Sequence, residues 1–186
     1  KRLGGSVVND TLASDRFYGQ LNLNELHFFA GGHVAPPIAG GRIYEYQHRV
    51  YYVKHNANSI PTLYRHSLSS TALMGVAEPL VEGVEIMRFE FGIDTNGDSA
   101  VDTYLKTSDV TDSLWDQHRD AEIISVQVHL LLRAFQQDSA FKAGVTRTYP
   151  MPGGTVSVPD DGYRRKQVST TVVIRNPWLN TARETL

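Results

Sequence analysis

The residues best suited to chemistry form an acidic loop in the middle of the chain. Asp94, Asn96, Asp98 and Asp102 carry side-chain oxygen atoms at positions 1, 3, 5 and 9 of this loop, and Ala100 offers its carbonyl oxygen at position 7. Calcium takes six to eight oxygen ligands, and alternate residues of a curled loop supply them together. The spacing therefore predicts a calcium site built by these five residues.

Two positions depart from the EF-hand pattern for such a loop. Ser99 stands where the sixth-position glycine is expected, and Leu105 stands where a bidentate glutamate would close the ligand shell. A site without that glutamate binds calcium more weakly or takes an acid from elsewhere in the chain. The acids available for this are Asp109, Asp112, Asp160 and Asp161.

The same loop has an alternative interpretation that needs no metal. Asn96-Gly97 is a preferred centre for a two-residue β-hairpin turn. It stands between a predicted strand that ends at Ile93 and a second predicted strand over residues 101–105. Both interpretations stay open at the level of the sequence.

A basic run follows Tyr163, where Arg164, Arg165 and Lys166 are consecutive cations. Such a run can contact DNA phosphates or acidic groups of a partner, but three charges support only weak, strongly salt-dependent DNA binding. Charges at a strand edge more commonly discourage pairing with other chains. The sequence favours the edge interpretation, with DNA or partner contact through these three cations as the alternative.

The sequence offers no motif that would activate a nucleophile or hold a nucleotide. It lacks the His-Glu-x-x-His, Gly-x-Ser-x-Gly and Gly-x-x-x-x-Gly-Lys-Ser/Thr patterns, and it contains no cysteine. We therefore predict that the chain is not an enzyme and nominate no catalytic residue. The rival hypothesis is a calcium-dependent secreted enzyme in which the acidic loop holds a structural metal.

The composition describes one moderately sized chain with nearly balanced charge. It has 186 residues, and its 18 Lys and Arg residues against 20 Asp and Glu residues leave a formal net charge of −2. This balance excludes a global field that would draw the protein onto DNA or an anionic membrane. The length suits one hydrophobic core, so we predict a single domain over residues 1–186.

Several segments show the pattern of antiparallel β-strands, because aromatic and β-branched residues alternate with polar ones between turn-forming clusters. The clearest alternation runs over residues 124–133. The predicted strands are residues 43–54 with a hairpin partner at 62–66, residues 80–93, residues 124–133 and residues 167–175.

Helical and loop signals are weaker than the strand signals. Ser108-Asp109 can cap a short helix that reaches His118, and Val8 with Leu12 indicates the end of an amphipathic helix. Residues 30–41 and 151–162 are rich in glycine and proline and lack periodicity. We predict that both are surface loops.

Several distinctive blocks follow one another within residues 42–176. They are Ile60-Pro-Thr-Leu-Tyr-Arg65, Leu80-Val-Glu-Gly-Val-Glu85, residues 94–104, Trp115, the strand at residues 124–133, and Tyr163-Arg-Arg through Thr170-Thr-Val-Val-Ile-Arg-Asn176. In this order the blocks resemble the PilW-type minor pilins of type IV pili.

This resemblance implies an α+β, pilin-like or pseudopilin-like fold in which an N-terminal helix packs on antiparallel β-sheets. Residues 1–18 would be the remnant of that helix, separated from a hydrophobic anchor before Lys1, and residues 42–176 would be the β-rich body. Residues 19–41 match no part of the family pattern, so the resemblance assigns them no role.

The resemblance also implies a function. A minor pilin of this kind primes or caps the pilus fibre through contacts with other minor pilins and the major pilin. It is anchored in the bacterial inner membrane by its N-terminal helix, faces the periplasm, and then reaches the extracellular pilus and its tip. Two alternatives remain: a pilus-tip module for cell adhesion that binds DNA or a surface through Arg164, Arg165 and Lys166, and a type II secretion pseudopilin.

Overall fold

A computed structural model of the chain describes residues 2–3, 16–21, 26–31, 42–69, 75–115, 121–141 and 144–174. Within these ranges, strands β1 to β13 make up most of the structure, beside one short α-helix and two 3-10 turns. The chain divides into two compact units, the first comprising residues 1–52 and 63–81, the second residues 53–62 and 82–186. The single domain over residues 1–186 stays a prediction.

The predicted α+β fold with an N-terminal helix packed on the sheets is wrong, because the described chain is mostly β-strand. Within the segment assigned to the helix remnant, Arg2–Leu3 forms β1 and Phe17–Leu21 forms β2. Tyr18 is buried in β2, and its ring stacks on that of Phe29 with 5.9 Å between centroids. Aromatic side chains pack well on pleated sheets, and strands pair with β2 on both sides, so Phe17 and Tyr18 are extended.

The first unit holds a four-stranded antiparallel sheet in the order β1-β4-β2-β3, with β3 at Leu26–Ala30 and β4 at Arg42–Tyr46. Ile43 is 1% exposed and forms part of its core. Strands β2 and β3 therefore occupy part of the region that had no assigned role. Residues 4–15, with the helical signal at Val8 and Leu12, lie outside the described residues. None of the helices in the described part of the chain is long and apolar enough to cross a bilayer.

The hairpin partner predicted at residues 62–66 is confirmed, but the single strand predicted over residues 43–54 is wrong, because these residues are divided between β4 and β5 (Arg49–His55) in different sheets. Strands β5, β6 (Pro61–Ser67) and β7 (Glu78–Glu82) form a sheet in that order. The side-chain oxygen of Asn56 accepts hydrogen bonds from the backbone N–H groups of Asn58 and Ile60, at 2.9 and 3.0 Å. An asparagine commonly closes a turn in this way, which explains why the strand pattern breaks here.

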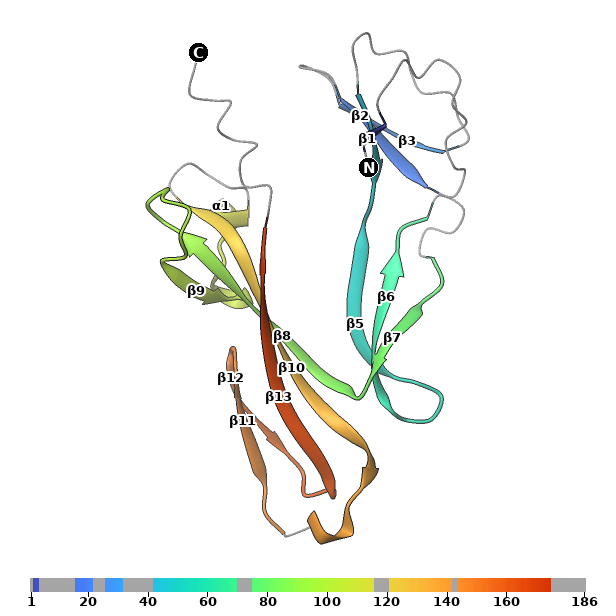
Figure 1. Cartoon of the computed structure of the whole chain (residues 1–186), viewed down its shortest axis with the longest axis vertical. Helices are drawn as coiled ribbons and strands as arrows, with labels where there is room; N and C mark the ends of the chain where they lie inside the picture. The colour runs from blue at the N-terminus through green and yellow to red at the C-terminus, as the bar shows by residue number, and fades with distance from the viewer. Residues whose placement is uncertain are drawn as a thin grey trace. The chain divides into compact units, whose positions relative to one another are not determined.

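The second unit is built on a larger antiparallel sheet in the order β13-β10-β8-β9 (Figure 1). Its strands are β8 (Val84–Asp94), β9 (Thr103–Lys106), β10 (Glu122–Gln137) and β13 (Tyr163–Val173). The register places Val128 of β10 opposite Phe89 of β8 and Thr170 of β13. The period-two alternation thus predicted the three long strands. Their bounds differ from the prediction, because residues 80–82 belong to β7 and β13 begins at Tyr163.

Two hydrophobic clusters cover opposite faces of this sheet. Ile93 and Ile123 pack with Val110, which follows the 3-10 turn η1 (Thr107–Asp109) and precedes helix α1 (Asp112–Trp115). The predicted short helix is therefore present, and its described part ends at residue 115. Ile93 and Ile86 differ by an odd number of positions in β8, so their side chains lie on opposite faces.

Ile86 belongs to the second cluster, whose buried members are Leu131, Met151 and Val158. Met151 lies in β11 (Arg147–Met151) and Val158 in β12 (Gly154–Val158), which form a hairpin of their own after the 3-10 turn η2 (Ser139–Phe141). The prediction that residues 151–162 form a loop is thus wrong for β12. The Gly153 and Gly154 residues hid the strand because they form its tight turn, both with positive φ.

Candidate functional site

The acidic loop connects β8 to β9, and Asp94 organises it from within. One carboxylate oxygen of Asp94 accepts hydrogen bonds from the N–H groups of Asn96 and Gly97, at 3.1 and 2.7 Å, and the other accepts one from Ser99 at 2.7 Å. Asp94 is 5% exposed. Burial opposes its ionisation, but these backbone N–H groups outweigh burial and hold the pKa of Asp94 below its ordinary value.

The remaining predicted ligands are held by the same kind of local contact. Asp102 accepts hydrogen bonds from the backbone N–H and the hydroxyl of Thr95, both at 2.7 Å. Asn96 accepts one from the N–H of Asp98 at 2.9 Å, and Asp98 accepts one from the N–H of Ala100 at 2.8 Å. All five predicted residues therefore come together in one loop whose side chains satisfy its own backbone.

This geometry rules out the two-residue hairpin turn. The pairing between β8 and β9 ends at Ile93 opposite Thr103, so the connection is far longer than the two-residue turn predicted at Asn96-Gly97. Ser99 adopts a φ of 67°, the left-handed conformation that a glycine supplies at the sixth position of an EF-hand loop. The departure in residue type therefore does not change the backbone conformation at that position.

Calcium binding at Asp94, Asn96, Asp98, Ala100 and Asp102 stays a prediction. Among the described residues, no group of three or more His, Cys, Asp or Glu side chains is arranged to hold a metal ion. The three aspartates of the loop, Asp94, Asp98 and Asp102, are among those residues and form no such group.

The acids considered as extra ligands are engaged elsewhere, with one exception. Asp109 pairs with Lys106 at 3.5 Å, Asp160 with Arg147 at 3.4 Å, and Asp161 with Arg165 at 2.7 Å. Asp112 opens helix α1. Only Asp112 is therefore left, among these candidates, without an ion pair to a described residue.

The three consecutive cations at the start of β13 do not form one patch. Arg164 is exposed and pairs with Asp138 through two nitrogens, at 2.8 and 2.7 Å. The side chain of Arg165 is 2% exposed and points into the unit. Lys166 lies exposed on the next position. Successive strand residues point to opposite faces, so the sequence run is divided between the interior and the surface.

Arg165 binds two acids that lie at very different distances along the chain, since Asp161 is four positions away and Glu85 is 80 positions away. Its guanidinium donates to Glu85 at 2.6 and 2.9 Å and to Asp161 at 2.8 and 2.7 Å. The hydrogen bonds from Arg165 lower the pKa of Asp161 to about 2, and those acids raise the pKa of Arg165 above its usual range. We refer to Arg165, Glu85 and Asp161 as the Arg165 cluster.

The Arg165 cluster removes one of the three predicted DNA or partner contacts. Four of the five N–H donors of the guanidinium bind the two acids, and the fifth is directed to the carbonyl oxygen of Tyr163 at 3.4 Å. Sequence reasoning missed this cluster. Glu85 and Arg165 each stood in a block that carries the family resemblance, but nothing in their spacing indicates that they meet.

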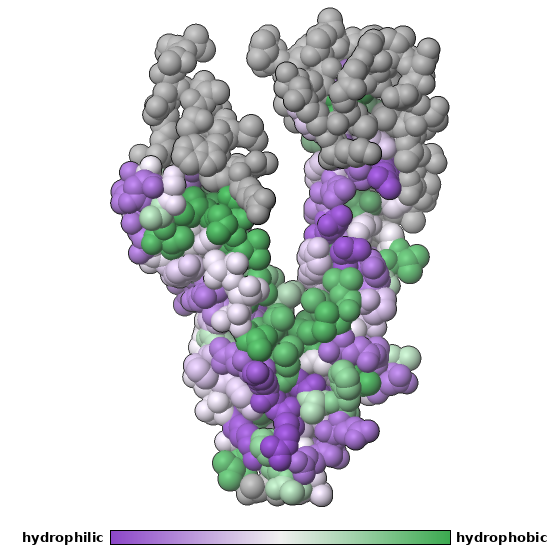
Figure 2. Space-filling view, in the orientation of Figure 1, coloured by the Kyte–Doolittle hydropathy of each residue, from purple (hydrophilic) through white to green (hydrophobic). Residues whose placement is uncertain are grey.

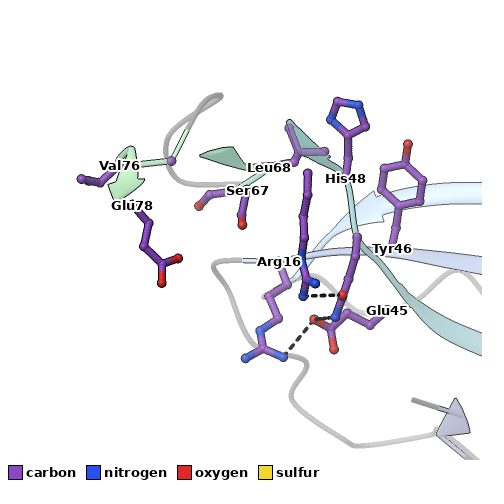
Figure 3. A pocket seen from close by; sticks show the side chains of 12 residues that line it. Arg16, Glu45, Tyr46, His48, Ser67, Leu68, Val76 and Glu78 are labelled. Carbon is purple, nitrogen blue, oxygen red and sulfur yellow. Dashed lines mark hydrogen bonds and ion pairs between the residues drawn. The ribbon is translucent and has the colours of Figure 1, made fainter. Parts of the chain in front are cut away.

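A polar cavity of about 390 Å³ lies in the first unit (Figure 3). Its charged and amide side chains bind one another: Arg16 pairs with Glu45 at 3.0 Å, Gln47 donates to Glu45 at 3.1 Å, and Arg49 donates to Gln47 at 2.8 Å. The hydrogen bond from Gln47, with the charge of Arg16, lowers the pKa of Glu45. The cavity is a surface hollow with internally balanced charge.

Comparison with known proteins bears on both sites. A family model described as Type IV Pilus-assembly protein W matches residues 50–176, which is more than half of the chain and includes the acidic loop and the Arg165 cluster. No curated protein and no solved structure matches the chain.

Proposed function

We propose that this chain, which belongs to the type IV pilus-assembly protein W family, is a minor pilin that primes or caps the pilus fibre. The matched residues 50–176 carry the proposal, because they establish a place in type IV pilus assembly. The family description names the pilus and not a secretion system, which favours the pilus over a type II secretion pseudopilin. The proposal assigns the chain no reaction, so its work is done by binding surfaces.

The partners we propose are other minor pilins and the major pilin. The second unit exposes large hydrophobic side chains that a partner would cover, among them Trp115 at 48%, Phe135 at 58% and Val173 at 67% exposed. Aromatic residues are enriched at protein interfaces because they bury much surface at little entropic cost. We place the protein at the bacterial inner membrane facing the periplasm, and then in the extracellular pilus.

The test is a bacterial strain that lacks the gene for this protein. We expect few or no surface pili by electron microscopy, full recovery when the intact gene is restored, and the protein itself among purified fibres by immunoblotting. Deletion of the retraction machinery in the same strain separates failed initiation from rapid loss of pili. Normal pilus numbers together with absence of the protein from purified fibres would contradict the proposal.

A matched surface variant sharpens this test. Trp115→Ala removes an exposed ring that contacts Phe91 edge to face at 4.9 Å between centroids. If this surface binds a partner, the variant should reduce the number of pili. The purified variant protein should still unfold in one cooperative transition. Tyr104→Ala, which removes an exposed ring of β9 in the same unit, is the control for general loss of aromatic surface.

A further inference from the structure

The sheet of the second unit has two edges that differ in length. At one edge β9 spans Thr103–Lys106, and at the other β13 spans Tyr163–Val173. Among the described residues, no strand pairs with the outer side of β13. An edge strand of this length presents a row of unpaired backbone groups, which natural proteins normally protect.

The backbone groups that face outward can be identified from the register. The N–H of Ile174 donates to the carbonyl oxygen of Ile124 at 2.9 Å, and β13 pairs with β10 antiparallel from there. In an antiparallel ladder, alternate residues direct their N–H and C=O groups to the same neighbour. Even-numbered residues of β13 therefore bond to β10, and Ser169, Thr171 and Val173 direct their backbone groups outward.

Protection of this edge is uneven along the strand. Its first part carries three cations, and Arg164 is held by Asp138 there. The second part, residues 168–173, has no charge, no proline and no glycine, and it is rich in β-branched residues. Val172 and Val173 are 54% and 67% exposed. Such a segment pairs readily with other strands unless something covers it.

The surface around this part of β13 is also hydrophobic. In Figure 2, hydrophobic side chains gather over the C-terminal end of β13 and the adjoining end of β10. By contrast, the opposite edge of the sheet is short and ends in Lys106, which pairs with Asp109. Of the two described edges of this sheet, the β13 edge alone combines length, exposed backbone groups and apolar side chains.

We propose that an extended segment of another pilus subunit adds to the outer edge of β13 as a fifth strand of the sheet. The segment carries β-branched or apolar residues opposite residues 168–173 and an acidic residue opposite Lys166. Lys166 is exposed, makes no ion pair with a described residue, and shares a sheet face with Val168 and Val172. Backbone hydrogen bonds provide affinity in this mode of binding, and alternate side chains provide specificity.

This inference rests on the proposed function, because it takes the partner to be a pilus subunit. The experiment uses the purified chain and the purified soluble domains of the other minor pilins and the major pilin of the same pilus. Hydrogen exchange of the complex is expected to protect the amides of Ser169, Thr171 and Val173. Amides that already bond to β10 are expected to change little, so the pattern alternates along the strand.

Substitutions at Thr171 test the backbone contact directly. Thr171→Pro removes an outward N–H and leaves the β10 ladder intact, so we expect at least a tenfold weaker affinity in biolayer interferometry. Thr171→Ala keeps that N–H and is the matched control, with affinity expected within twofold of the wild type. If the proline variant unfolds, Thr171→Lys blocks the edge with a charge and leaves the backbone unchanged.

Three outcomes would overturn the inference, and they differ in what else they overturn. In the first, wild type, Thr171→Pro and Thr171→Lys bind a pilin with equal affinity, or the protected amides lie outside the β13 edge. This outcome refutes strand addition at β13 and leaves the minor-pilin function standing. No binding of any pilin removes the proposed function as well. Self-association of the wild type that Thr171→Pro abolishes would replace the pilus subunit with a second copy of this chain.

Discussion

The acidic loop and the Arg165 cluster lie in the same unit, and both hold buried or half-buried aspartates in their ionised form. In the loop, Asp94 is stabilised by N–H groups no more than five residues away. In the cluster, Asp161 is stabilised by Arg165, four positions along the chain, and the same guanidinium also binds Glu85, which is 80 positions from Arg165. The first arrangement is a local turn, whereas the second joins β8 to β13 and forms only when the sheet does.

The largest expected effect comes from the long-range arrangement. Arg165→Met keeps most of the side-chain volume but leaves Glu85 and Asp161 without their cation, so we expect a loss of about 3–5 kcal/mol in the free energy of unfolding. Arg164→Met at the neighbouring exposed ion pair should cost about 0–1 kcal/mol. Urea unfolding of both variants measures the difference. Equal losses of unfolding free energy in the two variants would show that the buried Arg165 stabilises the fold no more than the exposed Arg164 does.

A smaller loss is expected from the local arrangement. Asp94→Ala leaves three backbone N–H groups of the loop without their acceptor and should cost about 1–3 kcal/mol. Asp98→Ala removes the acceptor of one such group, that of Ala100, at an exposed position, so it should cost less. Urea unfolding of the two variants in the presence of a calcium chelator measures both losses without any contribution from bound metal. An equal effect of both substitutions would contradict the organising role of Asp94.

Acid should weaken the Arg165 cluster within a defined pH range. The folded-state pKa of Asp161 is about 2, below the ordinary value of about 3.9, so its contribution is fully present above about pH 4. That contribution is lost as the pH falls toward 2. Thermal unfolding is measured between pH 5 and pH 2 at intervals of about half a pH unit. The melting temperature should fall less steeply with pH in Asp161→Asn than in wild type. Identical slopes would refute the assignment.

The smallest expected effect is that of calcium on the loop. A site with a dissociation constant of about 0.1–1 mM gains roughly 0.4–1.4 kcal/mol in 1 mM calcium by mass action. The melting temperature should therefore rise by a few degrees between chelator and calcium, and Asp94→Ala or Asp98→Ala should abolish the rise. Arg165→Met should retain it, since the cluster holds no metal. No rise in the wild type would leave the loop as a metal-free turn.

Features that depend on neighbouring residues were predictable from the sequence. The alternation at residues 124–133 sets which side chains share a face, and the turn residues around Asn56 set the end of β5. The spacing of Asp94, Asn96, Asp98, Ala100 and Asp102 likewise determined that these residues would share one loop. In each case the relevant contacts span few residues, so the pattern and the structure carry the same information.

Features that depend on distant pairing were decided by the tertiary structure. The need for a glycine at position 92 of β8 is one example. A Cβ atom there would overlap the hydroxyl of Ser125 on β10, next to a register shift that no sequence pattern indicates. Phe17 and Tyr18, expected to be helical, lie in a strand because β3 and β4 pair with β2 on both sides.

In the basic run at the start of β13, the sequence likewise determined some features and the tertiary structure determined others. The sequence by itself determined that this segment is a strand and that its neighbouring side chains alternate in direction. Only the tertiary structure decided that Arg165 faces inward to two acids, and that no described strand covers the other edge. The reason is physical: a strand's own residues set its backbone conformation, but burial and charge pairing depend on which other strands lie beside it.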